Sequence, residues 1–226
     1  LELVHVEISD LTPIYNAPLR TLSLSESTTG RKRRDWSFLS ALPLEDLTLT
    51  NCLIDRLDPI SGKHLRALRL SGCPVTDLSP LRGQPIKTIA LSTLPVRNLS
   101  PVFEAPLEDV TFRDLPVESL AWLKGKPLKR CELKSLRLND VEFLRGSPVK
   151  ECRIQLGHPV DVSPLADCPL LRVLLLDEKC TGYERLRNHP GLKLISFREA
   201  PVTALPAQTA AEFWKEYDAK QVAGKK

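Results

Sequence analysis

The sequence contains no methionine, and aromatic residues make up only 5% of its 226 residues. It has 10 glycines and no long apolar run. A membrane-spanning helix needs about 18 or more consecutive apolar residues, so such a helix is excluded. The scarcity of glycine disfavours an α/β enzyme built around phosphate-binding loops. Because the chain has no initiator methionine, we expect it to be a piece of a longer protein.

Neither the net charge nor any sequence motif indicates a nucleic-acid ligand or a catalytic site. The 32 basic and 28 acidic residues give a net charge of +4, which falls short of a nucleic-acid-binding composition. There is no Gly-x-Ser-x-Gly elbow, and no Gly-rich loop, His-Arg-Asp or Asp-Phe-Gly motif of a kinase. The sequence therefore predicts no enzyme, no catalytic residue and no cofactor, and nucleic acid is not the expected partner.

Leucine is abundant instead, with 41 residues, and a core filled by one residue type suggests a repeated unit. Prolines mark the repeat on a 21-residue spacing in which His64 replaces one of them. The unit reads Pro-Leu-x-x-Leu-x-Leu-x-x-x-x-Val-x-x-Leu-x-x-Leu-x-x-x, and its positions are numbered below as columns 1 to 21. Column one contains Pro43, His64, Pro85, Pro106, Pro127, Pro148, Pro169 and Pro190.

Columns five and seven are apolar and are separated by one residue, which is the period of a strand with one buried face. Column five contains Leu1, Leu22, Leu47, Leu68, Ile89, Val110, Cys131, Cys152 and Val173. Column seven contains Leu3, Leu24, Leu49, Leu70, Leu91, Phe112, Leu133, Ile154 and Leu175. Each unit is therefore predicted to form a short strand whose columns four, six and eight face outward.

Later in each unit the apolar spacing becomes three, which predicts one tight 3₁₀ turn. Asp77-Leu78-Ser79-Pro80-Leu81 recurs with small changes at residues 10–14, 98–102 and 161–165. Ser before Pro suggests an N-cap followed by Pro at the first helical position. The serines of this motif also match proline-directed phosphorylation sites: Ser79, Ser100 and Ser163.

A 21-residue unit cannot bury its own apolar face, so neighbouring units must cover it. We predict an α/β chain folded as a right-handed solenoid of about ten rungs. A parallel sheet of short strands forms its concave face, and 3₁₀ turns form its convex face.

The span Leu65-x-x-Leu68-x-Leu70-x-x-Cys73-x-Val75 resembles the leucine-rich-repeat pattern, and the resemblance covers about residues 1–198. The Asp-Leu-Ser-Pro-Leu return resembles the internalin-like class, with one residue fewer per repeat. Residues 73–83 and 210–216 are also similar to repeat regions of planctomycete-type bacterial proteins. Some of those proteins carry a serine/threonine kinase domain before the repeats, and this association is implied by the resemblance alone.

The predicted boundaries are a solenoid over 1–198 that starts inside a repeat, a linker over 199–208, a capping helix over 209–220 and a frayed tail over 221–226. Thr209 and Glu212 form a capping box, and Phe213 and Trp214 can cover the last rung. The unit that starts at Pro18 is longer than the others, because the next one begins only at Pro43. Its extra residues form a basic loop, either solvated or bound to an anionic partner, with Arg31, Lys32, Arg33 and Arg34.

The six cysteines lack the spacing of a zinc site, so no metal is expected. They are Cys52, Cys73, Cys131, Cys152, Cys168 and Cys180, and at least five fall in core columns. We expect buried reduced thiols. A disulfide between neighbouring rungs is the alternative, because strands about 4.8 Å apart lie within disulfide reach.

The outward columns are rich in small hydroxyl residues in the first half and in mixed charges in the second. The candidate partner-binding residues are Asp109, Thr111, Arg113, Arg130, Glu132, Lys134, Glu151 and Arg153. Neighbouring rungs offer opposite charges, as with Asp109, Arg130 and Glu151, so cross-strand ion pairing is the simpler explanation.

The function predicted from this face is protein–protein interaction, without catalysis, within a larger bacterial regulatory or signalling protein. We expect a monomer that is not inserted in a membrane and lies in the cytoplasm, unless a transmembrane segment precedes residue 1. The alternative is a structural spacer that displays an absent, kinase-like enzymatic domain.

Overall fold

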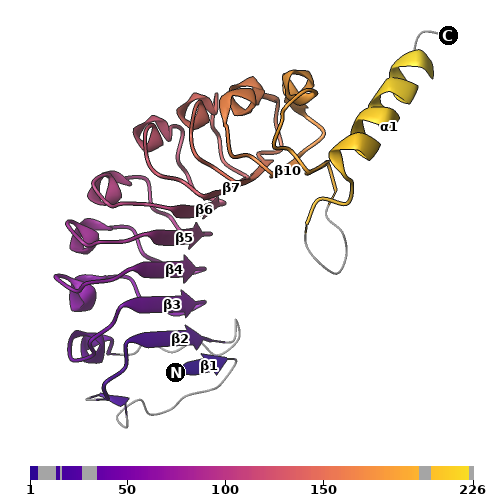
Figure 1. Cartoon of the computed structure of the whole chain (residues 1–226). Coiled ribbons are helices and arrows are strands. Elements are labelled where there is room, and N and C mark those ends of the chain that lie inside the picture. The colour runs from indigo at the N-terminus through magenta and orange to yellow at the C-terminus, as the bar shows by residue number, and fades with distance from the viewer. Residues whose placement is uncertain (5–13, 16, 27–34, 199–204, 224–226) are drawn as a thin grey trace. The chain divides into compact units, whose positions relative to one another are not determined.

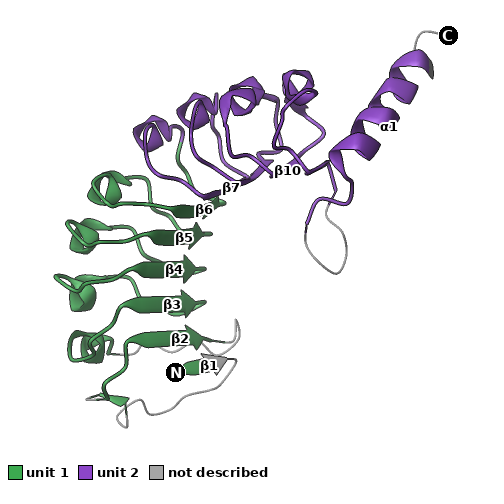
Figure 2. Ribbon diagram, in the orientation of Figure 1, with its two compact units in different colours: residues 1–117 green, residues 118–226 purple. Residues whose placement is uncertain are grey.

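In the computed structural model, the chain forms two compact units, residues 1–117 (unit 1) and residues 118–226 (unit 2) (Figure 2). The structure describes residues 1–4, 14–15, 17–26, 35–198 and 205–223. Within each unit, short parallel strands alternate with 3₁₀ turns (Figure 1). This is the repeat architecture that the sequence predicts.

Unit 1 contains six strands in its described part, and each pairs with the next in chain order. They are β1 (Glu2–Val4), β2 (Thr21–Ser25), β3 (Asp46–Thr50), β4 (Ala67–Ser71), β5 (Thr88–Ser92) and β6 (Asp109–Arg113). The turns between them are η2 (Ser37–Ser40), η3 (Asp58–Ile60), η4 (Ser79–Leu81) and η5 (Ser100–Val102). Thr21 pairs with Asp46, so the long repeat lies where the sequence places it.

Unit 2 forms its sheet from β7 (Arg130–Lys134), β8 (Glu151–Gln155), β10 (Val173–Leu176) and β12 (Leu194–Ser196). Its turns are η6 (Ala121–Leu123), η7 (Glu142–Leu144), η8 (Ser163–Asp167) and η9 (Tyr183–Leu186). The short strands β9 (Val160–Asp161) and β11 (Cys180–Thr181) pair separately. The α-helix α1 (Ala210–Ala223) follows.

The core consists of the apolar columns stacked rung upon rung. Leu22, Leu47 and Leu68 pair in register in column five, and each is fully buried. Burial of one such side chain contributes roughly 1.5–3 kcal/mol. Since each rung covers the apolar side of its neighbour, the free energy of unfolding is shared between adjacent repeats.

The predicted register is wrong at β10, where Leu174 pairs with Cys152 and Leu176 with Ile154. Leu174 and Leu176 therefore occupy columns five and seven, in place of Val173 and Leu175. The cause is one extra residue between Pro169 and the strand: Leu174 follows Pro169 by five residues, whereas Cys152 follows Pro148 by four. A count of prolines places Pro169 on the 21-residue spacing and conceals this insertion.

The predicted cap of the 3₁₀ turns also needs correction, because Pro80 is the second residue of η4 and Leu78 precedes the turn. The acceptor is Asp77, which receives the Ser79 N–H at 2.8 Å and its hydroxyl at 2.5 Å. These hydrogen bonds lower the pKa of the Asp77 carboxyl. Asp161 receives the same two groups of Ser163. The aspartate of the motif is therefore the capping side chain.

The residue that follows each of β3 to β7 has a positive φ, which turns the chain sharply at the strand end. The values are 56° at Asn51, 61° at Gly72, 53° at Thr93, 49° at Asp114 and 51° at Ser135. A β-branched residue such as Thr93 is strained in this region. At Gly72 a Cβ would overlap the side-chain amide of Asn51, which would have to move to admit a larger residue.

Column 21 connects neighbouring repeats by polar contacts near the turns. The buried Gln84 amide donates to the carbonyls of Ile60 and Pro80, both at 2.9 Å, and accepts from Leu65 N at 3.3 Å. The Cys168 thiol occupies the corresponding place in unit 2 and donates to Leu144 O at 2.9 Å. Side chains in this column thus donate hydrogen bonds to backbone carbonyls that have no donor within the 3₁₀ turns.

The C-terminal segment closes the last rung of unit 2. Ile195 N donates to Gln208 O at 3.2 Å and Ala210 N to Lys193 O at 2.9 Å, so the segment runs antiparallel to β12. The capping box forms, with the Glu212 carboxylate accepting Thr209 N–H at 2.9 Å. The aromatic cluster that covers the rung contains Tyr183, Phe197, Phe213, Trp214 and Tyr217.

Candidate protein-binding surface

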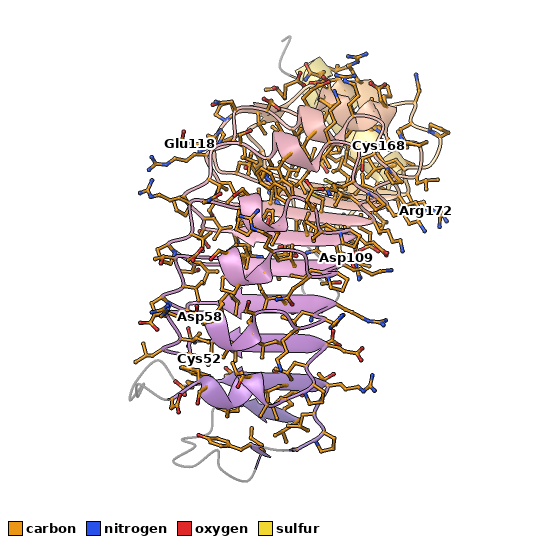
Figure 3. All side chains as sticks on the ribbon, turned by 90° about the vertical axis from the view of Figure 1, so that its left-hand side faces the viewer. Cys52, Asp58, Asp109, Glu118, Cys168 and Arg172 are labelled. Carbon is orange, nitrogen blue, oxygen red and sulfur yellow. The ribbon has the colours of Figure 1, made fainter. Side chains whose placement is uncertain are left out.

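The outward sheet face, formed by columns four, six and eight, consists of small polar residues over most of unit 1. It carries Thr21, Ser23, Ser25, Asp46, Thr48, Thr50, Ala67, Arg69, Ser71, Thr88, Ala90 and Ser92. On the last strand, β6, lie the candidates Asp109, Thr111 and Arg113, all half-buried. Thr88 Oγ1 contacts Asp109 Oδ2 at 3.4 Å, so this carboxylate also interacts within the face. Asp109 is labelled in Figure 3.

On unit 2 the same face carries charged pairs of opposite sign. Arg130 pairs in register with Glu151, and Glu132 with Arg153, between β7 and β8. Lys134 is exposed and pairs with Gln155. The register therefore brings together the five candidates of unit 2, while Asp109, Thr111 and Arg113 form a separate set on unit 1.

The charged face of unit 2 ends at β10, where the outward positions become apolar. Leu175 occupies column six beside Arg153 and is fully buried. The next outward residue, Ser196 of β12, is 2% exposed. Accessible candidates on this unit are thus confined to β7 and β8.

Column three, immediately before each strand, is a second charged row that the sequence analysis missed. In unit 1 it reads Arg20, Glu45, Arg66, Lys87 and Glu108. Glu45 pairs with both Arg20 and Arg66, and Lys87 Nζ lies 2.9 Å from Glu108 Oε1. Each cation of this row therefore contacts a carboxylate on a neighbouring rung.

In unit 2 the corresponding residues are Lys129, Lys150, Arg172 and Lys193, all exposed. Arg172 lies at the margin of unit 2 in the view of Figure 3. Within the described part of the chain, Lys150, Arg172 and Lys193 make no ion pair. Counting from the prolines places Leu171 and Leu192 in column three, so Arg172 and Lys193 join this row only in the register that the structure shows.

The six cysteines are buried free thiols, as expected. Burial raises the pKa of Cys52 to about 12 and that of Cys168 to about 11. A hydrogen bond with Cys131, the residue in register with it, and burial both raise the pKa of Cys152. The Cys52, Cys152 and Cys168 thiols are therefore neutral at pH 7, which makes them poor nucleophiles and metal ligands.

Other kinds of site find little support in the structure. Among the described residues, no group of three or more His, Cys, Asp or Glu side chains could hold a metal ion. None of the helices in the described ranges has the length and apolar character to cross a bilayer. The basic loop Arg31–Arg34 lies outside the described residues.

Comparison with known proteins identifies the fold. No family model and no curated protein matches the chain. The structure of internalin C2 from Listeria monocytogenes is similar with a TM-score of 0.66 and 23% identity, covering 78% of this chain and 80% of that one. Internalin F from the same species matches with a TM-score of 0.70 and 18% identity, over 85% of this chain and 58% of that one.

These similarities identify an internalin-like leucine-rich-repeat solenoid with parallel strands, 3₁₀ turns and a C-terminal helix. The predicted fold class is confirmed.

Proposed function

We propose that the chain is a non-catalytic protein-interaction module and that the charged part of its outward sheet face contacts the partner. The observation that supports this most directly is the register of β7 with β8, which places Arg130, Glu132, Glu151 and Arg153 in one two-by-two array. A rigid array of alternating charges can select a partner of complementary pattern. The small hydroxyl residues of unit 1 leave room for a partner backbone to approach.

The wider context belongs to the same proposal. We place the module in a larger bacterial regulatory or signalling protein, on the resemblance of its repeats to planctomycete-type proteins. We propose a cytoplasmic location, because all six cysteines are free thiols and disulfides are characteristic of oxidising compartments.

The test is a charge reversal of the face: Arg113→Glu, Arg130→Glu and Lys134→Glu in one variant. A matched control, Lys124→Glu, Arg137→Glu and Arg185→Glu, changes the net charge equally at exposed positions outside the face. A partner captured from the source organism is identified by mass spectrometry, purified and titrated against all three proteins.

We expect the face variant to lose at least tenfold in affinity and the control to lose less than threefold, since close charge pairs at an interface contribute on the order of 1.5 kcal/mol or more. Equal affinity of wild type and face variant would overturn the assignment of the contact to this face, and failure of the wild type to capture any partner would favour the alternative of a structural spacer.

A further inference from the structure

The column-three cations of unit 2, Lys129, Lys150, Arg172 and Lys193, form what is called here the basic ladder. Their backbones are hydrogen-bonded rung to rung: Arg172 N donates to Lys150 O at 2.9 Å, and Lys193 N to Arg172 O at 2.8 Å. Lys150 N donates to Lys129 O at 2.8 Å in the same manner. The four residues therefore follow one another at the strand spacing of about 4.8 Å.

In unit 1, side chains of column three are long enough to contact those of the neighbouring rung. Its backbone bonds are equivalent, with Arg66 N donating to Glu45 O at 2.7 Å. There the side chains of neighbouring rungs form ion pairs, as Lys87 does with Glu108. In unit 2, Lys150, Arg172 and Lys193 bring like charges together on adjacent strands, which is destabilising. An acidic ligand would remove this repulsion.

We propose that the basic ladder binds an acidic α-helix of a partner protein. The proposal does not depend on the outward sheet face, which uses other columns. Three intervals of the ladder span about 14 Å. Four carboxylates spaced one helical turn apart on an α-helix span three turns, about 16 Å. Alternate residues of an extended strand would span about 20 Å. Flexible lysine stems absorb a misfit of about 2 Å more readily than one of about 6 Å, so the helix fits better.

A single-stranded nucleic acid would need aromatic side chains between the cations, on which bases could stack. The aromatic residues of unit 2 near its end pack against one another instead, as Phe213 does with Phe197 at 5.2 Å and with Trp214 at 5.0 Å. Arg187 lies over the Trp214 ring at 5.2 Å and also pairs with Asp218. None of the residues next to the ladder cations in the sequence is aromatic, which favours an acidic protein.

The test uses the full chain and a synthetic helical peptide with glutamates at positions i, i+4, i+7 and i+11, which form one stripe. A second peptide of the same composition distributes the glutamates around the helix. The ladder variant is Lys150→Glu, Arg172→Glu and Lys193→Glu, and the control is again Lys124→Glu, Arg137→Glu and Arg185→Glu. Circular dichroism and melting curves establish that each variant is folded.

We expect the striped peptide to bind at least tenfold more tightly than the distributed one, with affinity falling between about 0.05 and 0.3 M salt. The ladder variant should lose at least tenfold and the control less than threefold. Equal losses in the two variants, equal binding of the two peptides, or tighter binding of a single-stranded oligonucleotide would each overturn the proposal. None of these results affects the face variant, so the two proposals fail separately.

Discussion

Units 1 and 2 repeat the same backbone but fill column three with different charges. Unit 1 alternates cations with Glu45 and Glu108, so the row neutralises itself. Unit 2 has four cations on successive rungs. The units also end differently, since β10 and β12 have apolar or buried outward residues and α1 packs against β12. The repeat determines the position of each side chain on the backbone. The two units then differ in the surface residues, which the packing of the core does not constrain.

The largest expected effect comes from opening the closed end of unit 2. Phe213 is 4% exposed and contacts Tyr183, Phe197 and Trp214, so Phe213→Ala leaves a cavity under the last rung. We expect unit 2 to lose about 3–5 kcal/mol of stability. In a repeat protein the loss should be local. Hydrogen exchange should accelerate in β12 and α1 while β3 to β5 keep their protection.

Lys215→Ala is the matched control, because this side chain is exposed on the same helix. It should leave both the exchange rates and the unfolding midpoint almost unchanged. Uniform acceleration of exchange across both units after Phe213→Ala would contradict the local role of the cap.

The second effect compares the two kinds of column-21 contact. Gln84→Leu removes three hydrogen bonds and leaves the buried Ile60 carbonyl and the partly buried Pro80 carbonyl without their amide donor. Loss of about 2–3 kcal/mol is expected on chemical denaturation. Cys168→Val in unit 2 should cost about 1 kcal/mol or less, because a thiol is a weak donor. If the two variants lose equal stability, the amide hydrogen bonds of Gln84 contribute no more to stability than the thiol hydrogen bond of Cys168.

The third effect concerns the turn after each strand, where unit 1 has Thr93 and the β8 repeat of unit 2 has Gly157, both at positive φ. Thr93→Gly relieves a strained β-branched residue and should raise the free energy of unfolding by up to about 1 kcal/mol. Gly157→Ala should lower it by about 1 kcal/mol, although open space surrounds this glycine. Thermal unfolding of both variants measures the contrast, and a destabilised Thr93→Gly would contradict it.

The sequence predicts the repeat, the strands and the buried columns because each depends on a period that the residues display directly. Leu47 and Leu68 recur at the 21-residue spacing because both fill the same buried position of the repeat, and they pair in register in the core. The β10 register escapes this logic, since the extra residue follows Pro169 and leaves that proline on the 21-residue spacing. Asp77 is missed as the cap because Ser79 and Pro80 also suit a cap by type. Column three is charged and has no apolar period. Its side chains are recognised as one interacting row only from the ion pairs that they form in unit 1.

The smallest expected effect tests the charge comparison itself, by exchanging one residue of each row. Glu45→Lys takes the shared carboxylate from Arg20 and Arg66 and should destabilise the chain, whereas Lys150→Glu gives the basic ladder an anion between cations and should stabilise it. Each change should amount to about 0.2–1 kcal/mol, the range of exposed ion pairs. Salt distinguishes this electrostatic origin from altered packing: both effects should shrink between about 0.05 and 0.5 M salt, because exposed charges are then screened within a few ångströms. If Lys150→Glu is neutral at low salt, the ladder cations do not repel one another, and relief of repulsion cannot favour an acidic partner.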